Sequence, residues 1–186
     1  DGVHGPEPWA TDGTDTFLVK DVNPGFASIE PSFFPTGDGR AIILADDGSA
    51  GREPWVSNGT GEGTYLLRDI WPGFVSSSAG AFTAAGGLVF FGAEDEDNGF
   101  ELWKTAGTTW GTRLVRNVGT SVGGMQPMEM FAFGGALYFD IHDKDTGTEL
   151  WRLDPATDQP ILLKDINPGI VGSNPTILAA SGEFLY

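Results

Sequence analysis

The segment Phe17–Gly25 reads FLVKDVNPG and recurs as YLLRDIWPG at Tyr65–Gly73 and as ILLKDINPG at Ile161–Gly169. A fourth, more divergent copy runs from Arg113 to Val118. The acid or amide at the centre of each copy lies 48 residues from the next, in the series Asp21, Asp69, Asn117 and Asp165. A fixed period of this length indicates a repeat architecture, in which every unit folds in the same way.

Tryptophan follows the same period. Trp55, Trp103 and Trp151 are 48 residues apart, and Trp9 precedes Trp55 by 46 because the first copy lacks two residues that match Gly61 and Glu62. Dividing 186 residues by 48 gives about 3.9 units. We therefore predict one repeat array over residues 1–186, with unit phases that begin near Asp1, Asp47, Asp95 and Asp143.

Each unit carries four apolar runs separated by turn residues. In the third unit the runs are Glu101–Lys104, Arg113–Val118, Glu129–Phe133 and Ala136–Asp140. Short alternating runs of this kind predict β-strands. A four-stranded unit that can bury its second face only against the next unit indicates a propeller blade. The expected fold is all-β, a β-propeller of four 48-residue, four-stranded blades, as a closed four-blade ring or as part of a larger propeller.

The composition of the chain limits the classes of partner that it can bind. The chain has 26 acidic and 10 basic residues, a formal net charge of −16, which repels nucleic acid and anionic lipid. No apolar run approaches the roughly 18 residues of a membrane-spanning helix. The absence of Cys excludes disulfides and thiol catalysis. We expect neither nucleic-acid binding nor membrane insertion.

Reactive side chains give little indication of catalysis. His4 and His142 are the two histidines, and they do not form part of a recognisable triad or His-rich metal centre. Pairs of carboxylates can be assembled from any chain with 26 acids, so they carry little information. The prediction is a protein that is not an enzyme. A hydrolase or lyase with an unidentified site in a propeller channel stays an alternative.

The repeated motif resembles that of the bacterial ELWxxDGT repeat family. The matching residues are Glu101-Leu102-Trp103, Glu149-Leu150-Trp151, Asp12-Gly13-Thr14 and the two Lys-Asp-Val/Ile-Asn-Pro-Gly segments. The resemblance covers essentially the whole chain and departs most in the third unit, where Ala106 replaces the Asp of the motif. It implies a β-propeller array in secreted or surface-exposed bacterial proteins, so an extracellular or cell-surface location is expected. It implies little about the ligand.

Two features repeat in every unit and suggest structural roles. A Glu precedes each Trp by two positions, so both side chains leave a strand on the same face. One cation also occupies the same phase in each unit. We predict a Glu–cation pair beside a largely buried Trp, with solute binding as the alternative. The residues are Trp9, Trp55, Trp103 and Trp151 with Lys20, Arg68, Arg116 and Lys164.

The turns before two of the Glu-Leu-Trp strands are rich in acids. Calcium prefers carboxylate and carbonyl oxygens that converge from a compact loop. Asp and Gly also form hairpin turns without a metal, and that reading stays open. The candidate calcium ligands are Asp95, Asp97 and Glu101 in one unit, and Asp143, Asp145 and Glu149 in the next.

Residues that break the repeat are not explained by the fold. Trp71 stands where two other copies have Asn, and Trp110 stands at the phase of Glu62. Exposed aromatic side chains on loops suit sugar stacking or a protein contact. We therefore predict an extracellular binding or adhesion module for a protein or carbohydrate ligand. Spacer repeats of a large surface protein are the alternative.

The ends of the repeat array bear on ring closure. Only four residues are missing between the phase of Tyr186 and that of Asp1, which favours a closed ring in which the last strand lies beside the first Glu-Pro-Trp strand. An unclosed ring would expose its sheet edges, and we would then expect self-association.

Overall fold

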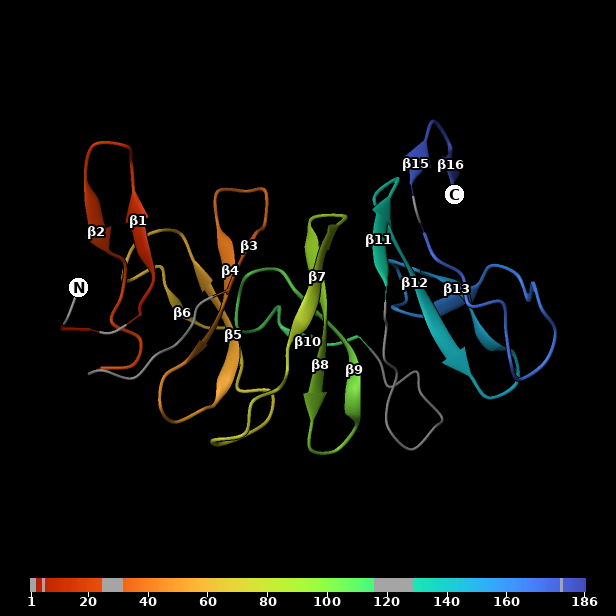
Figure 1. Cartoon of the computed structure of the whole chain (residues 1–186), viewed down its shortest axis with the longest axis horizontal. Helices are drawn as coiled ribbons and strands as arrows, with labels where there is room; N and C mark the ends of the chain where they lie inside the picture. Colours follow the sequence, from red (N-terminus) through yellow and green to blue (C-terminus); the bar gives the residue numbers. More distant parts are fainter. Residues whose placement is uncertain (1–2, 5, 25–31, 116–128, 178) are drawn as a thin grey trace. The chain divides into compact units, whose positions relative to one another are not determined.

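The computed structural model describes residues 3–4, 6–24, 32–115, 129–177 and 179–186. These residues form strands and turns without a helix, so the all-β prediction is confirmed (Figure 1). It follows that the described part of the chain offers no helix long and apolar enough to cross a membrane.

Three sheets contain four antiparallel strands each, in sequence order. The first is β3 (Ser32–Pro35), β4 (Ala41–Asp46), β5 (Arg52–Ser57) and β6 (Tyr65–Leu66). The second is β7 (Gly80–Ala85), β8 (Leu88–Asp95), β9 (Gly99–Thr105) and β10 (Arg113–Leu114). The third is β11 (Met130–Phe133), β12 (Ala136–Asp143), β13 (Gly147–Leu153) and β14 (Pro160–Leu162). Two shorter sheets pair β1 (Trp9–Thr11) with β2 (Thr16–Leu18) and β15 (Ala180–Ser181) with β16 (Phe184–Leu185).

The four-stranded sheets straddle the predicted unit phases. Asp95 ends β8 and Asp143 ends β12, so these phases fall at the middle hairpin of the second and third sheets. Each sheet thus takes two strands from one 48-residue unit and two from the next. In each four-stranded sheet the Glu-x-Trp segment lies in the third strand, which is β5, β9 or β13. The number of blades and the closure of a ring stay predictions, and Asp1 lies outside the described residues.

Glycine pairs form the hairpins between the first two strands of two sheets. Gly86 and Gly87 join β7 to β8 with φ of 59° and 80°, and Gly134 and Gly135 join β11 to β12 with φ of 57° and 78°. Two successive positive φ values match the twist of an antiparallel pair, and glycine adopts them without a steric penalty.

The chain divides into two compact units, which we describe separately. Unit 1 is Asp1–Ala79 with Gly107–Thr112, and unit 2 is Gly80–Ala106 with Arg113–Tyr186. In unit 1, a buried cluster consists of Val22, Ile43, Ala45 and Trp55. In unit 2, a larger cluster includes Phe90, Leu102, Leu137, Phe139 and Ile141. The last three alternate along β12, as expected for one buried face of a strand.

Candidate functional site

The turn Gly107–Thr112 of unit 1 presents the most exposed large apolar side chain described, Trp110, at 97% exposure. The turn is held by its own hydrogen bonds. The Gly111 amide donates to the carbonyl of Thr108 (3.1 Å), and the Thr112 hydroxyl donates to the same carbonyl (2.8 Å). Thr112 is buried, which anchors the end of the turn. Trp110 therefore projects from an ordered segment.

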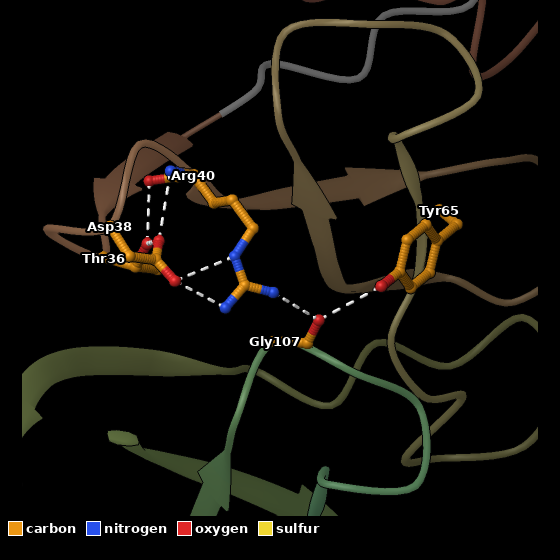
Figure 2. Close-up of polar contacts among 5 residues, drawn as sticks. All are labelled: Thr36, Asp38, Arg40, Tyr65 and Gly107. Atoms are coloured by element: carbon orange, nitrogen blue, oxygen red, sulfur yellow. Dashed lines mark hydrogen bonds and ion pairs between the residues drawn. The ribbon is translucent and has the colours of Figure 1, made fainter. Parts of the chain in front are cut away.

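Two side chains hold the start of this turn, Arg40 from the β3–β4 connection and Tyr65 from β6 (Figure 2). Arg40 Nη1 donates to the carbonyl oxygen of Gly107 at 2.9 Å, and the Tyr65 hydroxyl donates to the same oxygen at 3.1 Å. A carbonyl oxygen has two lone pairs, so both bonds can form together. The backbone three residues before Trp110 is thus fixed by two donors.

Arg40 is itself positioned by Asp38 (Figure 2). Its Nε and Nη2 donate to Asp38 Oδ2 at 3.0 and 2.6 Å, while Thr36 donates to Asp38 Oδ1. Hydrogen bonds from the Arg40 and Thr36 side chains hold the pKa of Asp38 far below its ordinary value. Asp38 is therefore a carboxylate at neutral pH, and it orients the guanidinium toward Gly107.

Glycine is required at position 107 for this contact. Its φ is +71°, and a Cβ atom there would lie 2.3 Å from Arg40 Nη1 and 2.7 Å from Cζ. A side chain at this position would strain the backbone and displace the guanidinium.

The repeated cations contact backbone carbonyls in unit 1. Lys20 Nζ donates to the Thr64 carbonyl at 2.6 Å and lies 5.6 Å from the ring centroid of Trp55. Arg68 Nη1 lies 3.5 Å from the carbonyl of Thr112, the residue 48 positions after Thr64. The cation of one repeat thus contacts the same carbonyl of the next. Lys164 is exposed, and Arg116 lies outside the described residues.

The repeated Glu residues bind backbone amides, which differs from the predicted Glu–cation pair. Glu7 accepts from Val22 (2.9 Å) and Asn23 (3.2 Å). Glu53 accepts in the same way from Ile70 (3.2 Å) and Ser77 (2.8 Å). Glu149 accepts from the amides of Asn167 and Ser173 and from the Ser173 hydroxyl. All three are buried, and the two amides satisfy each carboxylate where water cannot reach it.

The carboxyl groups of Glu53 and Glu149 accept equivalent amide hydrogen bonds in the two units, but their pKa values shift in opposite directions. Burial raises the pKa of Glu53 from 4.5 to about 7, against the opposing effect of hydrogen bonds that include the Ile70 and Ser77 amides. The pKa of Glu149 is lowered, because hydrogen bonds from the Ser173 side chain and nearby amides outweigh burial. The bond from the hydroxyl of Ser173 to Glu149 Oε2, at 2.6 Å, is the shortest of these bonds.

The repeated tryptophans are not equally covered. Trp55 and Trp103 are 7% and 3% exposed, and Trp151 is half-buried. Trp9 is 40% exposed, so the expected burial does not hold for this residue. The reason is that its sheet contains only β1 and β2 among the described strands, whereas Trp55, Trp103 and Trp151 lie inside four-stranded sheets.

The acidic turns use their first carboxylate to cap the backbone. Asp95 Oδ1 accepts from the amides of Asp97 (3.0 Å) and Asn98 (2.6 Å), and Asp143 Oδ1 accepts from that of Asp145 (2.9 Å). Within the described ranges, no group of three or more acid or histidine side chains is placed to hold a metal ion. The candidate ligands Glu101 and Glu149 are buried. Calcium binding stays a prediction.

Trp71 occupies a second exposed segment of unit 1. It is half-buried, whereas its neighbour Phe74 is 82% exposed. The structure gives no aromatic contact between Trp71 and Trp110 in the part of the chain it describes. Of the two predicted binding residues, Trp110 is therefore the better presented.

Sequence reasoning missed the residues that support Trp110. Arg40 breaks the repeat, because the residues 48 and 96 positions later are Leu88 and Ala136. The criterion that selected Trp110 could therefore have found Arg40. The same comparison would not have shown that Arg40 contacts Gly107, which is 67 residues away in the chain.

Comparisons with known proteins bear on the fold. No family model and no curated protein matches the chain, so the ELWxxDGT resemblance stays a prediction. Among solved structures, the Pyrococcus horikoshii acylaminoacyl peptidase in its orthorhombic crystal form is similar, with a TM-score of 0.53 and 12% sequence identity. The match covers 86% of this chain and 22% of the peptidase chain. At this identity, the similarity concerns the fold alone.

Proposed function

We propose that this chain is a non-enzymatic binding module of β-propeller blades, whose ligand contact is Trp110. The observation that carries the proposal is the 97% exposure of an aromatic side chain on a turn that Arg40 and Tyr65 hold in place. Tryptophan presents a large apolar face to a ligand and is enriched where binding energy is concentrated.

Fixing the turn before binding favours affinity. A mobile loop would lose conformational freedom on contact with a ligand, and this loss weakens binding. Here the Gly107 carbonyl accepts two side-chain hydrogen bonds, and the turn adds bonds of its own around Thr108. The ordering cost is therefore largely met in the free protein. A flat indole on a rigid turn suits a sugar ring or a complementary protein pocket.

Other features support the wider proposal. The four-stranded meanders, each with its Trp strand third, are the sheets expected of blades. Two histidines and no cysteine leave few groups for catalysis. The resemblance to surface repeat proteins supports an extracellular or cell-surface location. The ligand class is a protein or a carbohydrate.

The experiment compares the chain with its Trp110→Ala variant on arrays of immobilised oligosaccharides and extracellular matrix proteins. We expect a subset of spots to bind the parent chain. The variant should bind the same spots with an affinity lower by a factor of about 10 or more, as for an interface residue worth about 1.4 kcal/mol or more. Phe17→Ala is the matched control, because Phe17 is also exposed in unit 1. Equal binding by Trp110→Ala would contradict the proposal and favour a spacer role.

A further inference from the structure

Asparagine precedes glycine at two places in the sequence, and both places are turns. Asn58-Gly59 lies in the turn between β5 and β6, and Asn98-Gly99 lies where β8 turns into β9. An Asn-Gly pair can lose its side-chain amide without an enzyme, because no Cβ shields the glycine nitrogen as it approaches the side-chain carbonyl carbon. The two pairs have the same sequence, so the structure around each one decides whether it reacts.

The side chain of Asn58 is directed forward along the chain, toward the glycine. Its Oδ1 accepts from the Thr60 amide at 3.0 Å and from the Thr60 hydroxyl at 2.8 Å. A turn of this kind folds the asparagine side chain over the peptide bond that follows it, so Cγ lies on the side of the Gly59 nitrogen. Asn58 is exposed, and no other part of the chain lies within 4 Å of the point where a Cβ of Gly59 would be. Solvent therefore reaches both reacting residues.

The hydrogen bonds around Asn58 favour attack on its side chain. When the Gly59 nitrogen adds to Cγ, Oδ1 becomes an oxyanion, and the two donors of Thr60 are already aimed at it. Donors fixed before the reaction stabilise the developing charge without a cost of reorganisation. The Gly59 amide gives up one bond of 3.1 Å, to Ser57 Oγ. A single neutral hydrogen bond contributes little net free energy, so this loss is the smaller effect.

The side chain of Asn98 is held in the opposite direction. Its Nδ2 donates to both carboxylate oxygens of Asp95 at 2.9 Å each, three residues back in the chain. The amide is thus turned away from Gly99, and the nitrogen that would leave is bound. Asn98 is also half-buried, and Glu96 and Asp97 add further negative charge next to it. Negative charge opposes loss of the Gly99 proton, which the attack requires.

The repeat shows that the fold accepts an aspartate at the position of Asn58. Asp12 precedes Asn58 by 46 residues, the offset of the first copy, and Asp154 follows it by 96. Asp12 Oδ1 accepts from the Thr14 amide at 2.8 Å, which corresponds to the bond that Asn58 Oδ1 accepts from the Thr60 amide. An aspartate formed at position 58 would therefore keep the turn.

We propose that Asn58 deamidates spontaneously, whereas Asn98 keeps its amide. The Gly59 nitrogen gives its proton to solvent and bonds to Cγ, and the Cγ–Nδ2 bond breaks as Nδ2 takes a proton from water and leaves as ammonia. Water then opens the cyclic imide at Cγ, which gives aspartate, or at the backbone carbonyl, which gives isoaspartate. Each event consumes one water, releases one ammonia and adds one negative charge. The reaction needs no ligand at Trp110, so it is independent of the proposed function.

The two products affect the turn differently. Isoaspartate routes the main chain through Cγ and leaves the former backbone carboxyl as a side chain, so the bonds between position 58 and Thr60 are lost. The Thr60 carbonyl in turn accepts from the Thr64 hydroxyl at 2.7 Å, and the Thr64 carbonyl accepts from Lys20 at 2.6 Å. Isoaspartate should therefore loosen the turn as far as Thr64, and aspartate should not.

Mass spectrometry of the aged protein tests the proposal. The whole chain is incubated at mildly alkaline pH, and samples are then cleaved with trypsin. Asn58 is the only side-chain amide in the tryptic peptide 53–68, and Asn98 is the only one in 69–104, so each acts as the control for the other. We expect the mass increase of deamidation to appear in peptide 53–68 faster than in peptide 69–104 by a factor of about 10 or more. Equal rates, or a faster reaction at Asn98, would overturn the proposal.

Two controls show whether the structure is the cause. In guanidinium chloride the two rates should approach each other, because the unfolded chain lacks both the Thr60 donors and the bonds to Asp95. A difference of the same size in the unfolded chain would overturn the proposal. In the folded protein, Thr60→Val should slow the reaction at Asn58, and Thr60→Ser, which keeps the hydroxyl, should restore the parent rate. A rate in Thr60→Val that equals or exceeds that of Thr60→Ser would also overturn it.

Discussion

Replacing Glu53 with Gln should remove a pH-dependent loss of stability from unit 1. Burial raises the pKa of Glu53 from 4.5 to about 7, so the folded state keeps a proton that the unfolded chain has already lost over this interval. Rising pH therefore favours the unfolded chain. At about 1.4 kcal/mol per pH unit, the parent loses about 3 kcal/mol between pH 4.5 and pH 7 through this group. Gln does not titrate, so this contribution disappears.

The assay is urea unfolding from about pH 5 to about pH 8. We expect the stability difference between parent and Glu53→Gln to change with pH in favour of the variant as pH rises. Below the ordinary pKa the variant should be less stable, because its amide nitrogen faces the Ile70 or Ser77 N–H. Glu149→Gln is the matched control. The lowered pKa of Glu149 adds stability that is fully present above its ordinary value of 4.5 and is lost only as pH falls below it, so the stability difference between this variant and the parent should stay nearly constant across the assay range.

A stability difference that is independent of pH in Glu53→Gln would refute the assignment of a raised pKa. Hydrogen exchange supplies a local measurement. The Ser77 amide donates to Glu53 at 2.8 Å, so its exchange should be faster in the variant than in the parent at low pH. Unchanged exchange at Ser77 would show that protection of this amide does not depend on the carboxyl group of Glu53.

Three further changes test other contacts. Arg40→Gln should lower stability by less than about 1 kcal/mol, since the ion pair is partly exposed, yet raise the mobility of Trp110 in fluorescence anisotropy; unchanged anisotropy would show that the turn holds itself. Phe91→Ala should cost about 3 to 5 kcal/mol in urea unfolding, because Phe91 is fully buried, and a cost below about 1 kcal/mol would contradict that packing. If the acidic turns bind calcium, the ion should raise Tm reversibly, and Asp95→Asn should reduce this increase. An unchanged Tm would show that these turns are hairpins that bind no calcium.

The strand positions were largely predictable, because the repeat shows each strand several times. The expected run Ala136–Asp140 lies within β12, and Glu129–Phe133 contains β11. The sheet boundaries were not predictable from the period. A repeat of 48 residues can be cut at any phase, and only the hydrogen bonds show that Asp95 and Asp143 sit at mid-sheet hairpins.

The hydrogen-bond partners of the charged side chains also could not be predicted from the sequence. Glu53 and Arg68 repeat in phase, which suggested an ion pair, but a period does not distinguish a carboxylate from a backbone group as the partner. Backbone amides bind Glu53 instead, and Arg68 approaches the Thr112 carbonyl. The exposure of Trp110 was correctly suggested by its departure from the repeat.

The most direct test of the binding proposal is an NMR titration that follows the indole N–H resonances of the six Trp residues. The ligand is one selected on the arrays, and Trp110→Phe assigns the resonance of Trp110. We expect ligand to shift the Trp110 resonance most and to change those of the buried Trp55 and Trp103 little. A ligand that binds with full affinity and leaves the Trp110 resonance unshifted would contradict this expectation.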